Sequence, residues 1–159
     1  MRKFIALIGL ISLLVSCKSK QEAVSTTVDR RSQVAIKGNW TLTNVAYAGS
    51  DYIKVTSFEV ADAKCFEGSV WEFVSNNDTG KMTLTKSGCT MYSSDIKWYV
   101  TKEQQFVLKF LNEGAKARKV KEGYILTLTN QTMESFQLVD VVDIAGNKGK
   151  VTYTFRKNK

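Results

Sequence analysis

The sequence predicts an all-β fold: an eight-stranded antiparallel up-and-down barrel, preceded by a signal peptide and a flexible tether. From residue 39 onward, apolar side chains recur at every second position, which is the period of a strand with one buried face. Short turn-forming segments separate most of these runs, so neighbouring strands are expected to form hairpins. Closing the series into a barrel removes its exposed edges, although a two-sheet sandwich would show the same periodicity.

The expected strands follow one another along the chain. Trp40 and Leu42 alternate with threonines in the first run, and Tyr153 and Phe155 alternate with threonines in the last. The eight runs cover residues 40–43, 71–73, 81–85, 96–101, 106–110, 126–129, 136–138 and 151–156. Only the link at residues 49–68 is long, and it has room for a short extra strand or helix around residues 52–58.

The N-terminus has the pattern of a signal peptide over residues 1–16. Two basic residues precede an uncharged run of thirteen residues, whereas a membrane-spanning helix needs about 20. The run leads into Leu-Val-Ser-Cys at residues 14–17, which resembles a bacterial lipobox. The resemblance implies that Cys17 becomes the acylated first residue, carrying chains such as palmitate, and that the protein is anchored in the bacterial cell envelope, at the outer membrane. An ordinary signal peptide followed by an accidental cysteine is the alternative.

Residues 17–35 are expected to form the lipidated N-terminus and a flexible tether. Within the polar segment at residues 18–32, only Ala23, Val24 and Val28 are aliphatic, which is too little apolar surface for a packed element. A coil of this length spans about 20 Å. The barrel domain is then expected at residues 36–159.

Composition excludes several classes of function. The chain has no histidine, which removes Ser-His-Asp and Cys-His nucleophiles and His-ligated zinc. Asp51, Glu59, Asp62, Glu67 and Asp78 show no spacing that would pair two carboxylates on one strand face. The net charge of +8 falls to +6 without the two basic residues of the signal peptide, and it is spread over an exported chain. We therefore expect no catalytic residue, no metal, no cofactor and no nucleic-acid partner.

Two cysteines remain once Cys17 is acylated. Cys65 and Cys89 are an even pair in an exported protein, which indicates a disulfide. The strand-like runs at residues 70–74 and 81–85 flank a turn, so both cysteines lie beyond the open end of one hairpin and can meet there. A metal site is the alternative, but two thiols without histidine leave a metal short of ligands.

The strand pattern also resembles that of the lipocalins. Gly38 and Trp40 match a Gly-x-Trp motif at the head of the first strand, and Arg156 stands at the end of the last strand. In that family a basic residue there often packs over the tryptophan, which implies barrel closure through these three residues. The resemblance extends over residues 36–157 to the lipocalin-like lipoproteins of Bacteroidota, through the features Cys65, Trp71, Phe73, residues 78–80 and Cys89. The chain lacks the Thr-Asp-Tyr motif and the amphipathic helix after the last strand that typical lipocalins have.

An eight-stranded barrel is just wide enough to be filled by its own side chains or to hold one small ligand. The expected interior is rich in aromatic residues, which form either a solid core or an apolar pocket. The candidate ligand-binding residues inside the barrel are Trp71, Trp98, Phe110, Phe136 and Tyr153.

Cationic residues gather in two links that an up-and-down barrel places at the same end. The residues expected to ring this open end are Lys116, Arg118, Lys119, Lys121 and Lys148. Such a rim suits an amphiphile with an acidic head, such as a fatty acid, although a basic loop can also serve solubility alone. Two functions remain open: a membrane-anchored lipoprotein that binds a small apolar or amphiphilic molecule, or a non-enzymatic envelope interaction protein, such as an inhibitor or accessory subunit, with a filled core.

Overall fold

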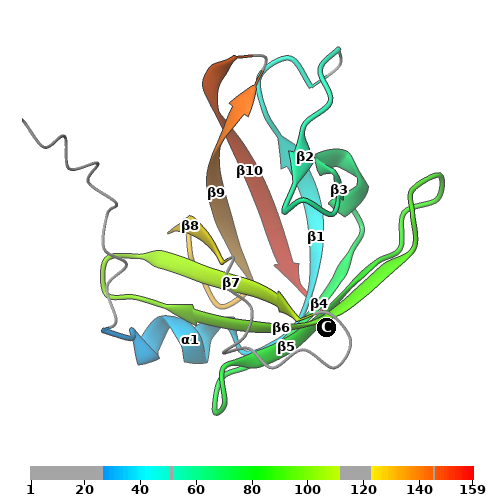
Figure 1. Ribbon diagram of the computed structural model, residues 1–159. Helices are drawn as coiled ribbons and strands as arrows, with labels where there is room; N and C mark the ends of the chain where they lie inside the picture. The colour runs from blue at the N-terminus through cyan, green and yellow to red at the C-terminus, as the bar shows by residue number, and fades with distance from the viewer. Residues whose placement is uncertain (1–26, 51, 112–122, 145) are drawn as a thin grey trace, which may run out of the picture.

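A computed structural model describes residues 27–50, 52–111, 123–144 and 146–159. Its eight main strands form a closed antiparallel barrel in which each strand pairs with its neighbours in the chain, and the first strand pairs with the last (Figure 1). The strands are β1 (Gly38–Ala46), β4 (Val70–Val74), β5 (Thr79–Leu84), β6 (Tyr92–Val100), β7 (Gln105–Leu111), β8 (Tyr124–Thr129), β9 (Ser135–Ile144) and β10 (Asn147–Lys157). The predicted up-and-down barrel is therefore confirmed, and the sandwich alternative is wrong.

Strands β1 and β10 close the barrel, as predicted from the first and last runs. Leu42 lies opposite Phe155, and both are fully buried. The residue that covers Trp40, however, is Lys157, whose Nζ lies 5.5 Å from the ring centroid. The prediction that Arg156 would cover this indole is wrong. Because side chains alternate along β10, Lys157 shares the inner face with Phe155, whereas Arg156 is exposed on the outer face.

Secondary structure is present before the predicted domain boundary. Residues 30–35, which were expected to belong to the tether, form most of the helix α1 (Arg30–Ile36). The Asp29 side chain caps this helix by accepting hydrogen bonds from the backbone N–H groups of Arg31 and Ser32. Ile36 is fully buried, and Val28 forms a bridge with Thr101 at the end of β6. The remaining tether residues, 17–26, lie outside the described part of the chain. Where the structure describes residues, it shows no helix long and apolar enough to span a membrane.

The long first link, whose described residues are 47–50 and 52–69, folds back over one end of the barrel. We call it the lid. It contains the extra secondary structure expected near residues 52–58, although this extends further along the chain. Its elements are β2 (Thr56–Ser57), β3 (Ala61–Asp62) and the 3-10 helix η1 (Ala63–Phe66). The predicted disulfide is present between Cys65 in η1 and Cys89 in the β5–β6 loop, with a Cα–Cα distance of 5.8 Å. It therefore ties the C-terminal part of the lid to the barrel.

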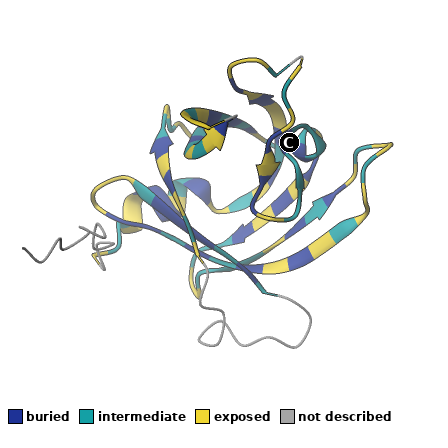
Figure 2. Ribbon diagram, turned by 45° about the horizontal axis from the view of Figure 1, so that its top comes forward, coloured by how far each residue is buried: buried dark blue, intermediate teal, exposed yellow. Residues whose placement is uncertain are grey.

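Burial alternates along the strands, as Figure 2 shows by colour. The inner faces carry one continuous apolar core that includes all three tryptophans. The two ends of the barrel are covered by different structural elements. The helix α1 lies across one end, which we call the closed end, and the lid lies across the other, which we call the mouth (Figure 1).

Candidate functional site

The closed end is sealed by hydrogen bonds between α1 and three separate parts of the barrel. Gln33 Nε2 donates to Asp78 Oδ1 at 2.7 Å, in the β4–β5 turn. Trp40 Nε1 donates to the carbonyl oxygen of Ile36 at 2.6 Å. Gln131 in the β8–β9 turn donates to the carbonyl oxygen of Ser32 at 2.9 Å. These contacts fix the helix across this end of the barrel.

Aromatic rings fill the half of the barrel next to the closed end. Phe136 stacks on Phe155 at 4.5 Å between ring centroids, and it meets the edge of Trp40 at 4.7 Å. Trp98 stacks on Phe106 at 5.6 Å. Two of the candidate ligand-binding residues, Trp98 and Phe136, thus belong to a packed layer in which each ring is in van der Waals contact with others. The solid-core alternative describes this half of the barrel.

At the mouth, the side chain of Phe58 occupies the interior from the lid side. Its ring centroid lies 5.3 Å from that of Phe66, 5.5 Å from Phe110, 5.1 Å from Tyr124 and 5.2 Å from Tyr153. We call these four surrounding rings the Phe58 cage. Only 6% of Phe58 is exposed, although it comes from a surface link rather than from a barrel strand. An aromatic side chain of the lid therefore occupies the space just inside the mouth.

The turn that carries Phe58 has an unfavourable backbone. Phe58 and Glu59 have φ angles of 54° and 53°, and the N–H of Val60 donates to the carbonyl oxygen of Ser57 at 3.0 Å. A two-residue turn with both central φ angles positive normally takes glycine or asparagine, and each other residue costs roughly 1–2 kcal/mol there. The β2–β3 turn is consequently held in place by its contacts with the barrel rather than by its own conformational preference.

Hydroxyl groups of the Phe58 cage hold this turn. Ser57 Oγ and the hydroxyl of Tyr153 are 2.6 Å apart, and the hydroxyl of Tyr124 donates to the carbonyl oxygen of Phe58 at 2.7 Å. Burial raises the pKa of Tyr153, so its hydroxyl stays protonated and can donate a hydrogen bond at any physiological pH. These are the polar groups that a molecule replacing Phe58 would meet.

A carboxylate also faces the interior. Asp140 lies opposite Val151, a fully buried residue, and the inner face of β9 continues on either side through Leu138 and Val142. Leu138 lies opposite Tyr153. Asp140 is the next inward residue after Leu138 and lies nearer the mouth. Burial raises the pKa of Asp140, and only a backbone hydrogen bond from Val141 opposes this effect.

The structure divides the candidate ligand-binding residues. Phe110 and Tyr153 lie on the inner face toward the mouth and contact Phe58 directly, whereas Trp71 lies opposite Trp40 and contacts both Phe110 and Phe155. Lys148 is exposed at the start of β10, next to the β9–β10 turn. The other predicted rim cations, Lys116, Arg118, Lys119 and Lys121, lie outside the described residues, as does Cys17.

Sequence reasoning missed Phe58, Tyr124 and Asp140. The alternation rule already pointed to Asp140, because it continues the series Phe136 and Leu138 in steps of two. Phe58 gave no such signal, since a single aromatic residue in a long link has no period.

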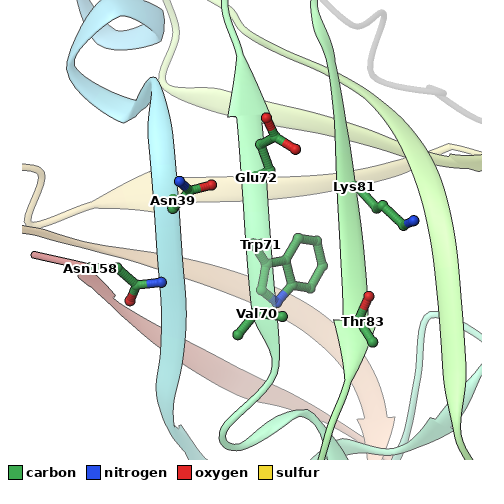
Figure 3. Close-up of a pocket in the computed structure, with 7 residues that line it drawn as sticks. All are labelled: Asn39, Val70, Trp71, Glu72, Lys81, Thr83 and Asn158. Carbon is green, nitrogen blue, oxygen red and sulfur yellow. The ribbon is translucent and has the colours of Figure 1, made fainter.

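Two further hollows lined by described residues lie on the outer surface of the barrel. One is a groove of about 360 Å³ that crosses β1, β4 and β5 (Figure 3). Its lining residues are Asn39, Val70, Trp71, Glu72, Lys81, Thr83 and Asn158. A second groove of about 370 Å³ shares Glu72 and Lys81 with it and continues toward β6. Both are wide open to solvent, and polar and apolar side chains line them together.

Comparison with known proteins agrees with this architecture. A family model described as a lipocalin-like domain matches residues 36–135. Since the match covers more than half of the chain, the protein belongs to the lipocalin-like domain family. The sequence-based resemblance to this family is therefore confirmed.

Similar solved structures include a complex of bovine odorant binding protein with a selenium-containing odorant. It is 11% identical with a TM-score of 0.45, and the alignment covers 80% of this chain and 73% of that one. A deswapped triple mutant of bovine odorant binding protein is 11% identical with a TM-score of 0.42, covering 78% and 74% of the two chains. No curated protein matches the sequence.

Proposed function

We propose that the protein is a membrane-anchored binder of a small apolar or amphiphilic molecule, which enters through the mouth and takes the place of Phe58. The observation that carries this proposal is the Phe58 side chain itself. It is an apolar group from a surface link, and it is surrounded by aromatic rings of the barrel. The turn that carries it has an unfavourable backbone conformation.

The attachment of the lid supports movement of this turn. Its C-terminal part is fixed, because Cys65 is disulfide-bonded and Glu67 accepts hydrogen bonds from Lys64, Lys86 and the N–H of Val45. The tip of the lid, which is the β2–β3 turn, is held by the hydroxyl groups of Tyr153 and Tyr124 and by the burial of the Phe58 ring. Release of the tip would therefore open the mouth while the rest of the lid stays in place, and relief of the strained turn would offset part of the lost contacts.

A binding assay with Phe58 variants tests this proposal. Phe58 competes with any ligand for the same space, so Phe58→Ala should bind the uncharged dye N-phenyl-1-naphthylamine at least about threefold more tightly than the unaltered protein. Fluorescence titration measures the affinity. Phe58→Leu should give a smaller gain in the same direction and serves as the milder variant if Phe58→Ala unfolds.

The matched control is Tyr52→Ala, which removes an aromatic side chain that is 94% exposed on the same lid. Its dye affinity should equal that of the unaltered protein. Saturable binding with the same dye affinity in both Phe58 variants as in the unaltered protein would contradict the proposal, because the dye would then bind elsewhere.

Anchoring through Cys17 is the second part of the proposal. It rests on the charged start, the short apolar run and the lipobox-like residues 14–17 of the sequence. Two or three acyl chains on Cys17 would give stable attachment, since each buried methylene contributes about 0.8 kcal/mol. We place the protein in the bacterial cell envelope, at the outer membrane.

Cys17→Ser should abolish acylation and release the protein into the soluble fraction of its own host. Cell fractionation followed by intact-mass measurement shows both effects. If the variant were cleaved after Ser16 and still remained with the membranes, the anchoring proposal would be wrong.

A second candidate function is that of an envelope interaction protein, such as an inhibitor or accessory subunit. The packed aromatic layer at the closed end favours it, together with the open grooves across β1, β4, β5 and β6. Native mass spectrometry of protein purified from its host distinguishes the two. A co-purifying small molecule supports the binder, and a stoichiometric protein supports the interaction module.

A further inference from the structure

We infer that the space filled by Phe58 is built to receive an apolar ammonium ion, whose charge is recognised by aromatic faces and by the inward carboxylate of Asp140. This inference rests on the proposed function, since it names the chemical class of the ligand at the same site. Two independent features carry it: the Phe58 cage and the position of Asp140.

The Phe58 cage supplies the first feature. When Phe58 leaves, the faces and edges of four aromatic rings remain around the vacated space, with centroids that lie 5.1–5.5 Å from the present ring centre. Phe110 and Tyr124 also contact each other at 5.8 Å, so these two rings form a continuous wall. Aromatic faces attract cations, and cages of such rings are a recurrent way of binding substituted ammonium groups.

Asp140 supplies the second feature. It lies on the inner face of β9 between Leu138 and Val142, and it is opposite the fully buried Val151. Within the part of the chain that the structure describes, the ion pairs involve Arg30, Lys64 and Lys86, and none of these reaches Asp140. An inward carboxylate among apolar residues without a cationic partner costs stability, and a cationic ligand would offset this cost.

The two features are adjacent. Tyr153 belongs to the Phe58 cage and lies opposite Leu138, which is two residues from Asp140 on the same inner face. A ligand with a short apolar chain could therefore place its body among the rings and its ammonium group between the Tyr153 ring and the carboxylate of Asp140. A fatty acid, which the sequence suggested, would instead bring a second negative charge close to this carboxylate.

Three probes that differ only in their head group test the inference. They are 4-phenylbutylammonium, 4-phenylbutanol and 4-phenylbutanoate, which are cationic, neutral and anionic at pH 7. Each is measured by its displacement of N-phenyl-1-naphthylamine from the unaltered protein. We expect the ammonium probe to bind about tenfold more tightly than the alcohol, and the carboxylate to bind most weakly.

Asp140→Asn removes the charge with almost no change in shape. It should weaken the ammonium probe about tenfold and leave the alcohol within twofold of its original affinity. The matched control is Asp95→Asn, which removes the same charge from an exposed position on the outer face of β6. This control should leave the order of the three probes unchanged.

The outcomes separate this inference from the proposed function. If the alcohol binds as tightly as the ammonium probe, or if Asp140→Asn does not alter their ratio, the inference is wrong while a binding site under Phe58 stands. If neither the dye nor any probe binds saturably, the proposed function fails together with the inference. The comparison of probes on the unaltered protein decides the question even if Asp140→Asn fails to fold.

Discussion

Asp140 is the residue at which stability and function oppose each other. Burial raises its pKa, because the surroundings of this carboxylate disfavour its charged form. A sequence selected for stability alone would place an apolar residue here, as at Leu138 and Val151 on the same inner surface. Retention of a costly charge inside a barrel is typical of a binding site.

Asp140→Asn should therefore stabilise the protein at neutral pH. Because the folded-state pKa lies above the unfolded value, the ionised group destabilises the fold above the folded-state pKa, and this cost disappears as the pH falls below the unfolded value of about 3.9. We expect the Tm at pH 7 to rise by about 2 °C or more, and the difference from the unaltered protein to vanish near pH 3.5. Thermal unfolding followed by circular dichroism at both pH values measures this. A lower Tm at pH 7 would mean that Asp140 makes a stabilising contact in the fold.

At the scale of elements, Glu67 joins the lid to the rest of the barrel. Its side chain accepts from Lys86 Nζ at 2.9 Å, from Lys64 Nζ at 3.1 Å and from the N–H of Val45 at 3.1 Å. Burial by itself would raise the pKa of Glu67, but these hydrogen bonds outweigh it and hold the pKa below the usual range. With the nearby disulfide, this cluster fixes the C-terminal part of the lid and leaves movement to the Phe58 turn.

Glu67→Gln should destabilise the protein at neutral pH, because the ion pairs of Glu67 with Lys64 and Lys86 are lost. The loss should be about 1 kcal/mol, since these ion pairs are partly exposed to solvent. The lowered pKa means that the contribution of Glu67 is present above the unfolded pKa and is lost as the pH falls through the folded one. Urea unfolding at pH 7 and at about pH 3 should show the larger difference at the higher pH. Glu72→Gln, on the exposed face of β4, is the control and should have little effect at either pH. Equal destabilisation by Glu67→Gln at both pH values would contradict the electrostatic explanation.

The elements that the sequence predicts well are those whose burial has a regular period. Alternation identified the eight barrel strands, and the pairing of β1 with β10 follows from closure. The helix α1 has only seven residues, which is too short to be stable by itself, and it forms because Gln33 and Ile36 contact turns and strands that follow it in the chain. The inward position of Phe58 likewise depends on contacts with Phe110, Tyr124 and Tyr153, which follow it by more than fifty residues. Such long-range contacts leave no local pattern in the sequence.

For the whole molecule, the two ends of the barrel have different roles. At the closed end, α1 and the stacked aromatic layer make a rigid base. At the mouth, a strained turn inserts one removable ring that is held by two hydroxyl groups, and the inward carboxylate of Asp140 lies on the mouth side of Tyr153. This difference between the two ends explains how a barrel with an aromatic core can still accept a ligand, since only the Phe58 side chain has to move.

The central claim is that a small molecule binds in place of Phe58, and a crystal structure of the protein with 4-phenylbutylammonium tests it most directly. The account predicts that the phenyl group lies within the Phe58 cage, that the ammonium group lies within hydrogen-bonding distance of Asp140, and that the Phe58 ring has left the interior while η1 and the disulfide are unmoved. A structure in which Phe58 keeps its present contacts and the ligand occupies the outer groove beside Val70 and Lys81 would contradict it.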